Sequence, residues 1–481
     1  RYFEIPPAFA VRRAGCAPSV ARPCRRMAAV AGDPAGEPEE QRIQAFLAWC
    51  RTLGADLRGV RLARDPARGF GVYSDVGIPA SAAAALVVPS EALLTVPRAV
   101  RSEVGRAALG SHTVQASGGI SAQALMYLAM IDGRARPESF WHPWLLLLPS
   151  SYSDPLWWMP KERARLLEGT QLFHDAARHE TQLRDVYDGL FPALSEECPR
   201  LFPKERYSFD AFRWARSSLS SRSFGEVALK TALGGADITS AVMDEPLTDE
   251  ESALLRFDCP AFMCPLLDFT NHDVTATVHV GLLPRGTSGW SLGLAVDGGV
   301  TAGTEVLNNY GTCRTNLQLL LGYGFCVKAN PADTVPIRLG ASQALAGPPI
   351  RQGALRRSGL RLDEVHQLSR ADPLPQRLLA QMRLMVMREK ALAKLARDVG
   401  AAPLKKAADA PEAVHAGFFK ALCEPLPLPS RDAPGAGELE VLGALKQQLV
   451  LKRRAIEQTP LDSNNGVNER SAAIYRQGQA H

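Results

Sequence analysis

Hydrophobic residues recur at helical spacing over several long stretches of the chain. Apolar positions three or four residues apart predict a short amphipathic helix over Gln41–Leu53 and a mostly helical segment over residues 91–212. The same spacing predicts two further helical regions near the C-terminus, one over Leu378–Leu395 and one over Leu442–Leu449. Helices are therefore expected to make up most of the ordered chain.

Short strand-like runs and loop-like segments separate these helices. Glu305–Leu307 and Asp333–Leu339 are short runs of the kind that form strands. Residues 235–258 carry several acids, and Ala401–Pro434 is punctuated by prolines, so both segments are expected to be loops or linkers. The chain thus mixes long helices with small amounts of strand.

One segment near the middle of the chain holds the densest set of local signals. Tyr310 ends a strand-like run, and Thr315-Asn316 can cap the apolar helix that follows. Gly322 and Gly324 are expected to break that helix, which leaves Tyr323 on an irregular turn. Two tyrosines therefore bracket a short apolar helix.

Composition and charge narrow the classes of function. The chain has 481 residues, of which 46% are hydrophobic and 22% charged, which suits two or three folded domains. Residues 1–32 hold six arginines, no lysine and one acid, so they account for the whole net charge of +5. The remainder holds no basic run beyond Lys452-Arg453-Arg454, whereas a nucleic-acid binder would usually keep a basic face on its folded part. No apolar run approaches the roughly 20 residues of a membrane span.

The cysteines and the N-terminal stretch bear on metal binding and on location. The nine cysteines are scattered and include no C-x-x-C pair, so we expect neither a metal site nor a disulfide framework. Residues 1–36 are rich in Ala, Arg and Pro and poor in acids, a composition typical of an organelle transit peptide. The alternatives are a disordered tail and a mistaken gene model.

Two segments in the middle of the chain resemble the signature motifs of SET-domain methyltransferases, in the branch that contains the Rubisco large-subunit lysine methyltransferases. That branch carries D-x-x-N-H-S and then Y-G-x-x-S-N-A-E-L-L-x-x-Y-G-F. The matching segments here are Asp268-Phe-Thr-Asn271-His272-Asp273 and Tyr310-Gly-Thr-Cys-Arg-Thr315-Asn316-Leu-Gln-Leu-Leu-Leu-Gly-Tyr323-Gly-Phe. The match is nearly continuous over about twenty residues, but Asp273 and Thr315 each replace a serine.

Other parts of the chain follow the same plan. Gly69-Phe-Gly71 and the strand-like Leu86–Pro89 resemble the family's opening strands, and Trp214 to Phe224 resembles its W-A-x-x-x-V-x-S-R-x-F segment. The resemblance implies an α+β fold: a SET domain of small β-sheets with a knot-like C-terminal segment, over residues 41–330. It places a helical insertion at about 91–212 and an all-α substrate-binding domain at 331–481, after the leader 1–36.

The resemblance also assigns roles to individual residues. It makes Tyr310 the catalytic residue. It places the contacts to S-adenosylmethionine at Arg68, Gly69, Phe70, Arg222, Asn271 and His272. It places the substrate contacts at Arg222, Asp268, Tyr310 and Tyr323. Asp273 is expected to leave the Asn271 and His272 contacts intact while adding a charge beside them.

The resemblance implies an S-adenosylmethionine-dependent protein-lysine N-methyltransferase. Its expected substrate is a plastid protein of the Rubisco large-subunit or fructose-bisphosphate aldolase class, docked on the C-terminal helical domain. A lysine must be neutral to accept a methyl group, and burial beside a cation lowers its pKa, so no dedicated base is required. We expect a monomer in the plastid stroma, with the cytoplasm as the alternative location.

Three other functions remain open at this point. One is a protein-histidine methyltransferase, because one branch of the family methylates histidine in actin. Another is a catalytically weak SET module that binds a protein partner. The third is metal-dependent phosphohydrolysis, with His272, Asp273 and His279 as ligands, although such sites need further His and Asp at set spacings.

Overall fold

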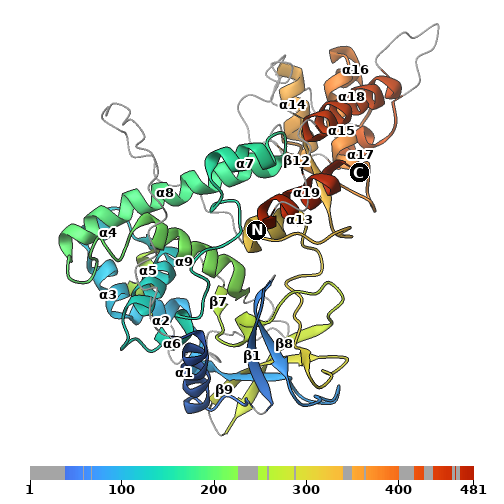
Figure 1. The fold of residues 1–481 in the computed structure, drawn as a ribbon. Coiled ribbons are helices and arrows are strands. Elements are labelled where there is room, and N and C mark those ends of the chain that lie inside the picture. Colours follow the sequence, from blue (N-terminus) through green and yellow to red (C-terminus); the bar gives the residue numbers. More distant parts are fainter. Residues whose placement is uncertain are drawn as a thin grey trace. The chain divides into compact units, whose positions relative to one another are not determined.

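The computed structural model describes most of the chain (Figure 1). The described residues are 38–57, 59–66, 68–225, 247–256, 259, 261–286, 289–339, 349–361, 364–399, 416–426, 437–457, 461 and 466–480. The predicted leader, residues 1–36, lies outside them. The two predicted loops, 235–258 and Ala401–Pro434, also lie outside them in part. The described part of the first contains the short helix α12 (Asp249–Ala253) and strand β6 (Leu255–Arg256). The described part of the second contains helix α17 (Ala416–Cys423).

The chain forms two compact units, and neither is a single stretch of sequence. Unit 1 comprises residues up to 157 together with 175–312 and 321–324. Unit 2 comprises 158–174, 313–320 and 325 onwards. The sequence indicated a change near residue 330, but it gave no sign that 158–174 and 313–320 pack with the C-terminal part.

Two three-stranded antiparallel sheets form the β part of unit 1. In the first, β2 (Gly69–Ser74) lies between β1 (Val60–Asp65) and β10 (Thr304–Glu305). In the second, β9 (Gly289–Val296) lies between β3 (Leu86–Pro89) and β8 (Val278–Arg285). Two smaller pairs join β4 (Ile120–Ser121) to β6, and β5 (Ser223–Gly225) to β7 (Ala261–Met263). These sheets are the small β-sheets that the motifs predicted.

Helices make up the rest of unit 1. The segment 91–212 is helical as predicted, and α1 (Glu39–Thr52) buries the predicted apolar face. The other helices are η1 (Ser90–Ala92), α2 (Val96–Arg101), α3 (Glu103–Gly110), α4 (His112–Ala116), α5 (Ala122–Ala135), α6 (His142–Leu145), α8 (Gln171–Glu197), α9 (Phe209–Arg222) and η2 (Leu267–Phe269). Serine side chains accept a backbone N–H at the N-terminus of α3, α4, α5 and α9, which fixes where these helices begin.

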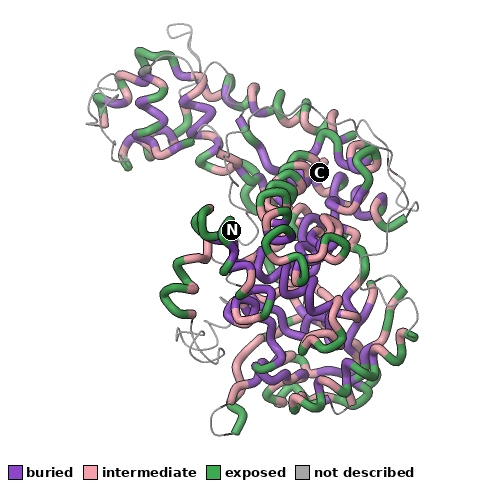
Figure 2. Tube along the Cα trace, turned by 90° about the vertical axis from the view of Figure 1, so that its left-hand side faces the viewer, coloured by how far each residue is buried: buried purple, intermediate pink, exposed green. Residues whose placement is uncertain are grey.

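Local sequence explains strand β1 and helix α9 of unit 1. Along β1, Val60 and Leu62 are buried while Arg61 is exposed, which is the alternation of a strand with one face on the core. Helix α9 packs on α5, with Phe212 against Tyr127, and buries its Trp214 completely. Figure 2 shows the continuous buried layer that these elements enclose.

The described residues of unit 2 form helices and one two-stranded ribbon. Strand β11 (Thr334–Arg338) is the predicted strand, and it pairs antiparallel with β12 (Val365–Ser369), which the sequence reading missed. The predicted Leu378–Leu395 helix is two helices, because the chain is extended at Met387. The helices are α7 (Pro160–Leu167), α13 (Asn316–Tyr323, whose last three residues belong to unit 1), α14 (Pro349–Ser358), α15 (Gln376–Val386), α16 (Glu389–Asp398), α17, α18 (Glu438–Glu457) and α19 (Gly466–Ala480).

Candidate active site

The two central motifs lie side by side in unit 1. His272 and Asn308 form a parallel β-bridge. The backbone N–H of Asn308 donates to the Asn271 carbonyl over 2.8 Å, and that of Asp273 donates to the Asn308 carbonyl over 2.8 Å. The Asn308 side chain also donates to the Thr270 hydroxyl over 3.2 Å. Segments almost forty residues apart in sequence are thereby held in one fixed register.

Tyr310 is held on several sides. Its hydroxyl donates to the Thr270 carbonyl over 2.8 Å, and its backbone N–H donates to Nδ1 of His272 over 3.1 Å. Its ring stacks on Tyr323 with centroids 4.8 Å apart, and on the His272 ring at 5.2 Å. Burial raises the pKa of Tyr310 well above its ordinary value, so the phenol stays protonated at neutral pH.

The second component of the site is a buried carboxyl beside an arginine. Arg222, the last residue of α9, donates to the backbone carbonyl of Asp268 over 2.8 Å, and its Nη1 lies 3.7 Å from the Asp268 carboxylate. Trp144 donates its indole N–H to the same carboxylate over 3.0 Å. Burial raises the pKa of Asp268 to about 7, and Arg222 and Trp144 oppose that rise.

Two atoms of this component have no hydrogen-bond partner among the described residues. They are Nε of Arg222 and Oδ1 of Asp268, and both are buried. An unsatisfied buried donor and acceptor are costly in a folded protein. Because they lie on neighbouring side chains, they mark a place where a ligand with its own acceptor and donor would find partners.

The third component is a polar chain that begins at the β1–β2 turn. Arg68 forms an ion pair with Glu305, and the Asn271 amide donates to Glu305 over 2.7 Å and to the Phe70 carbonyl over 3.1 Å. Gly69 has a φ of 81°, a conformation that L side chains rarely adopt, and no atom lies within 4 Å of where its Cβ would stand. The turn therefore leaves open space over its backbone.

Helix α13 ends differently from the prediction. Gly322 lies inside α13 and does not break it, and Tyr323 is the last helical residue rather than part of a turn. Gly324 ends the helix, because its φ of 83° is not helical. An added Cβ there would lie 2.9 Å from the Asp154 backbone N, so glycine fits this position. Helix α9 fixes this end: Ser220 donates to the Gly322 carbonyl over 3.1 Å.

Asp273 does not intrude on the other residues. Its carboxylate accepts from both the backbone N–H and the hydroxyl of Thr275, at 2.7 and 2.5 Å, and these bonds lower its pKa. The Asp273 carboxylate is therefore hydrogen-bonded within its own turn, which explains how an acid can replace the serine of the family pattern.

The structure brings together all nine residues that the sequence singled out, in three adjoining groups within unit 1. Arg68, Gly69, Phe70 and Asn271 form the polar chain; Arg222 and Asp268 form the buried pair; His272, Tyr310 and Tyr323 form the aromatic stack. Sequence reasoning missed the roles of Trp144, Thr270 and Glu305. Thr270 lies inside the first motif, but nothing local indicated its partners or those of Trp144 and Glu305.

A metal site finds no support in the described part of the chain. No three His, Cys, Asp or Glu side chains there are grouped so that they could hold an ion. His279 lies on the surface, 3.1 Å from Asp297, and His272 bonds to the Tyr310 backbone. The described helices also include none that is both long and apolar enough to cross a bilayer.

Comparison with known proteins shows which proteins this chain is similar to. No family model matches the chain. It is 28% identical to the actin-histidine N-methyltransferase of Mus musculus over 362 residues, and 27% identical to that of Homo sapiens. The matches cover 73% of this chain and 54% of each relative, so the chain spans about half the length of the curated relatives it matches.

Solved structures match over almost the whole chain. The SET domain of LSMT bound to lysine and AdoHcy superposes with a TM-score of 0.66 and 19% identity, covering 92% of this chain and 89% of that one. Rubisco LSMT bound to AdoMet gives a TM-score of 0.65 with 91% and 89% coverage. This chain has the SET-domain fold. The SET-domain fold expected from the two motifs is thereby confirmed.

Proposed function

We propose that this SET-domain protein is an S-adenosylmethionine-dependent protein methyltransferase. The observation that carries the proposal is the fixed Tyr310 hydroxyl, set by the Thr270 carbonyl and packed between the rings of His272 and Tyr323. A rigid phenol in a buried aromatic surround can orient an incoming nitrogen nucleophile and exclude water, which are the main requirements of a methyl displacement.

The residues present fit S-adenosylmethionine. The open space over Gly69 allows a ligand to approach the backbone closely, as the family resemblance implies for this loop. The unsatisfied Nε of Arg222 offers a donor for a carboxylate. When bound, S-adenosylmethionine supplies a methyl group on a positively charged sulfur.

The chain's own groups prepare the nucleophile. A target lysine has an ordinary pKa of about 10.4 and must lose its proton before it reacts. Desolvation in an aromatic surround and the nearby Arg222 cation both lower that pKa, while the raised pKa of Tyr310 keeps its hydroxyl protonated and uncharged. Tyr310 therefore acts by positioning, and solvent takes the proton.

We infer that the target is a lysine, because an aromatic surround such as Tyr310 and Tyr323 desolvates an amine and so favours the neutral form that accepts a methyl group. Histidine is the second candidate, favoured by the 27–28% identity to actin-histidine N-methyltransferases. A neutral imidazole needs no shift of its pKa near pH 7, so either chemistry is compatible with the site.

The test is transfer of a radiolabelled methyl group by the purified chain, starting at residue 37, to proteins of a plastid stromal extract and to actin. Labelling of the Rubisco large subunit or aldolase supports the proposed plastid location and lysine target. Labelling of actin supports the histidine alternative and the cytoplasm. Hydrolysis of the labelled protein followed by mass spectrometry identifies which residue carries the methyl group.

Tyr310→Phe is expected to lower turnover by roughly 100-fold or more while changing S-adenosylmethionine affinity by less than about threefold. Tyr323→Phe is the matched control, since it removes one hydroxyl from the same stack and is expected to cost less than about tenfold. Turnover is measured by label transfer, and affinity by calorimetry. Equal loss of turnover and affinity in Tyr310→Phe would assign that residue a structural role instead.

A further inference from the structure

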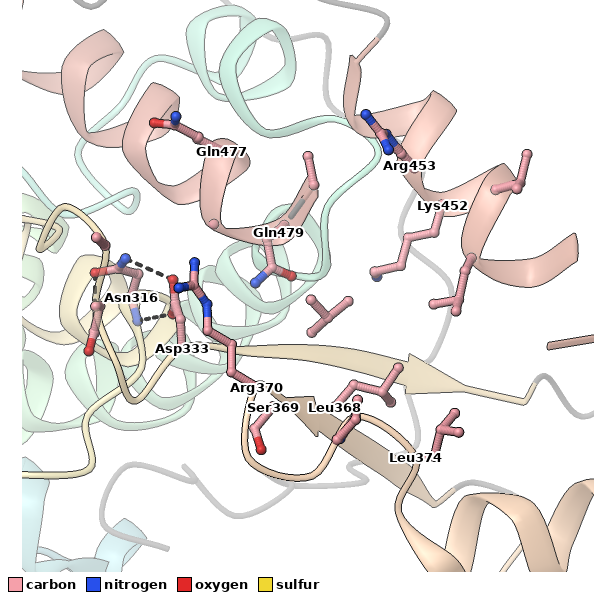
Figure 3. Close-up of a pocket in the computed structure, with 18 of the residues that line it drawn as sticks. Asn316, Asp333, Leu368, Ser369, Arg370, Leu374, Lys452, Arg453, Gln477 and Gln479 are labelled. Atoms are coloured by element: carbon pink, nitrogen blue, oxygen red, sulfur yellow. Dashed lines mark hydrogen bonds between the residues drawn. The ribbon is translucent and has the colours of Figure 1, made fainter. Parts of the chain in front are cut away.

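Unit 2 contains a cavity of about 730 Å³ that has no part in the methyl-transfer site (Figure 3). The β11–β12 ribbon and helices α18 and α19 form its walls. Its apolar lining comes from aliphatic side chains only: Val335, Leu368, Leu374, Leu442, Leu445, Leu449, Val450 and Ile474. A space of this size and character is of the kind that holds a ligand or a peptide side-chain cluster.

Several of these aliphatic side chains face solvent. Leu374 is 43% exposed, Leu442 41% and Val450 39%. Leu439 and Leu451, on the same helix α18 as Leu442 and Val450, are more exposed still. Single exposed leucines are normal, but a cluster around one cavity is not. The grouping indicates a surface that another molecule covers.

The charges around the cavity are strongly unbalanced. Five cationic side chains line it: Lys328, Arg370, Lys446, Lys452 and Arg453. The one lining acid, Asp333, already accepts from the backbone N–H and the side chain of Asn316 at 2.7 and 2.8 Å. Arg453 is already paired with Glu457 over 2.7 Å, whereas Lys328, Lys446 and Lys452 have no carboxylate partner in the described part of the chain. The cavity is therefore set up for an anionic occupant.

A buried glutamine adds an acceptor on the inner wall. Gln479 is 5% exposed, and its amide N–H donates to the Thr334 carbonyl over 2.7 Å. Its Oε1 has no hydrogen-bond partner among the described residues. Figure 3 shows the Gln479 and Lys452 side chains reaching into the space between the ribbon and the helices. An occupant must therefore bring an N–H donor as well as negative charge.

We propose that this cavity binds a peptide segment of the protein substrate that is rich in acidic residues and leucine. This inference rests on the proposed function. A peptide backbone supplies the N–H that Gln479 needs, its acidic side chains pair with Lys452 and Arg370, and its apolar side chains cover Leu374, Leu442 and Val450. A nucleic-acid strand fits less well, because the lining has no aromatic ring on which bases could stack.

Binding is tested on the intact chain by fluorescence anisotropy with a short labelled peptide of alternating Glu and Leu. Two matched peptides replace Glu by Lys, or Leu by Ser, and both are expected to bind at least about tenfold more weakly. Equal affinity for the Glu/Leu and Lys/Leu peptides would overturn the proposal. So would tighter binding to single-stranded DNA or to vesicles of anionic phospholipid.

Variants locate the binding in the cavity. Lys452→Glu and Leu374→Ser are each expected to weaken the Glu/Leu peptide by about tenfold, and Leu374 is exposed enough that its replacement leaves the core intact. Arg454→Glu is the control, since Arg454 is an exposed cation on the same helix that does not line the cavity. Equal effects of Lys452→Glu and Arg454→Glu would show that general charge, and not the cavity, governs binding.

Kinetics separate this inference from the proposed function. Lys452→Glu is expected to raise the KM for the protein substrate about tenfold and to leave kcat unchanged. Peptide binding without any methyl transfer would refute the proposed activity while leaving the docking site in place. Tyr310-dependent transfer with an unchanged KM in Lys452→Glu would refute the docking site and leave the activity standing.

Discussion

Asp268 shows how an environment assembled from distant parts of the chain changes a single residue. Its motif predicted only a substrate contact, but its carboxyl lies between Trp144 and Arg222, which are 124 and 46 residues away in sequence. Burial raises its pKa to about 7 although both neighbours favour the charged form. Desolvation therefore outweighs the arginine and the indole N–H at this position.

Asp268→Asn is expected to change how stability depends on pH. The folded-state pKa of about 7 exceeds the ordinary value of 3.8, so the folded protein holds a proton that the unfolded chain releases between those pH values. Wild-type stability should therefore fall by about 1 kcal/mol per pH unit through this window, relative to the Asn variant. Urea unfolding at pH 5 and pH 8 measures the difference. Parallel curves for the two proteins at both pH values would contradict a raised pKa.

Replacing Gly69 and replacing Gly71 by alanine are expected to lower the free energy of unfolding by different amounts. A Cβ at Gly71 would lie 2.5 Å from Oε1 of Glu305, so Gly71→Ala displaces Glu305 from Asn271 and should cost about 2–3 kcal/mol. Gly69→Ala meets only the strain of its positive φ, about 1 kcal/mol. Unfolding in urea ranks the two variants. The reverse order would mean that Glu305 can move away at little cost.

The contiguous part of the site could be predicted from sequence, and its partners could not. Residues 268–273 and 310–323 carry recognisable motifs, so their grouping followed from the order of those motifs. Arg68 pairs with Glu305 across 237 residues, and no local pattern links a turn arginine to one acid among fifty in the chain. Long-range pairs of this kind depend on the completed fold.

At the scale of elements, α13 shows how a motif can carry structure and chemistry together. Thr315 caps the helix, accepting the Gln318 N–H over 3.3 Å. Asn316 is buried and fully bonded: its side chain donates to Asp333 and to the Val327 carbonyl, and accepts the Val327 N–H. The replacement of serine by Thr315 preserves the cap, because both side chains carry the required hydroxyl.

Asn316→Ala is expected to destabilise the protein by roughly 3 kcal/mol, because it removes the side-chain hydrogen bonds of a buried amide to the half-buried Val327 backbone and Asp333 carboxylate. Thr315→Ala removes only one capping bond and should cost about 1 kcal/mol. Thermal unfolding of both variants compares the two costs. A larger effect of Thr315→Ala would show that the cap, rather than the buried amide, fixes this element.

The sequence predicted secondary structure correctly where the apolar repeat continued over many residues. The prediction failed where a glycine or a distant strand pairing determined the structure. Helix α1 and the segment 91–212 appeared as predicted because their buried faces repeat every three or four residues. Gly322 did not break α13, because α9 supplies a hydroxyl to its carbonyl. Strand β12 was missed because only its partner β11 gives it a ladder to join.

At the scale of the whole molecule, the units divide the sequence differently from its motifs. Helix α7 lies far from the C-terminus in sequence, yet in unit 2 its Arg165 pairs with Glu469 over 3.0 Å. The buried Arg476 donates to the carbonyls of Leu166 and Glu168 over 3.1 Å each. The C-terminal helix α19 therefore completes a structure that begins at residue 158.

Arg476→Met is expected to lower the melting temperature by several degrees, since it strands buried carbonyls in unit 2 at a cost of about 2–4 kcal/mol. Arg470→Met is the matched control, because Arg470 lies on the exposed side of the same helix. Scanning calorimetry measures both. Equal melting temperatures for Arg476→Met and the wild type would mean that α19 is held by its apolar contacts alone.

The pairing of His272 with Asn308 also has a consequence for how the protein is made. The Tyr310 site needs residues from Arg68 to Tyr323, so no shorter nascent chain can assemble it on the ribosome. Contacts that join such distant segments form slowly, because the intervening loop must first be closed. Strand β2 gains its second partner only after β10 has emerged, so one edge of the first sheet stays unpaired during most of synthesis and is open to aggregation.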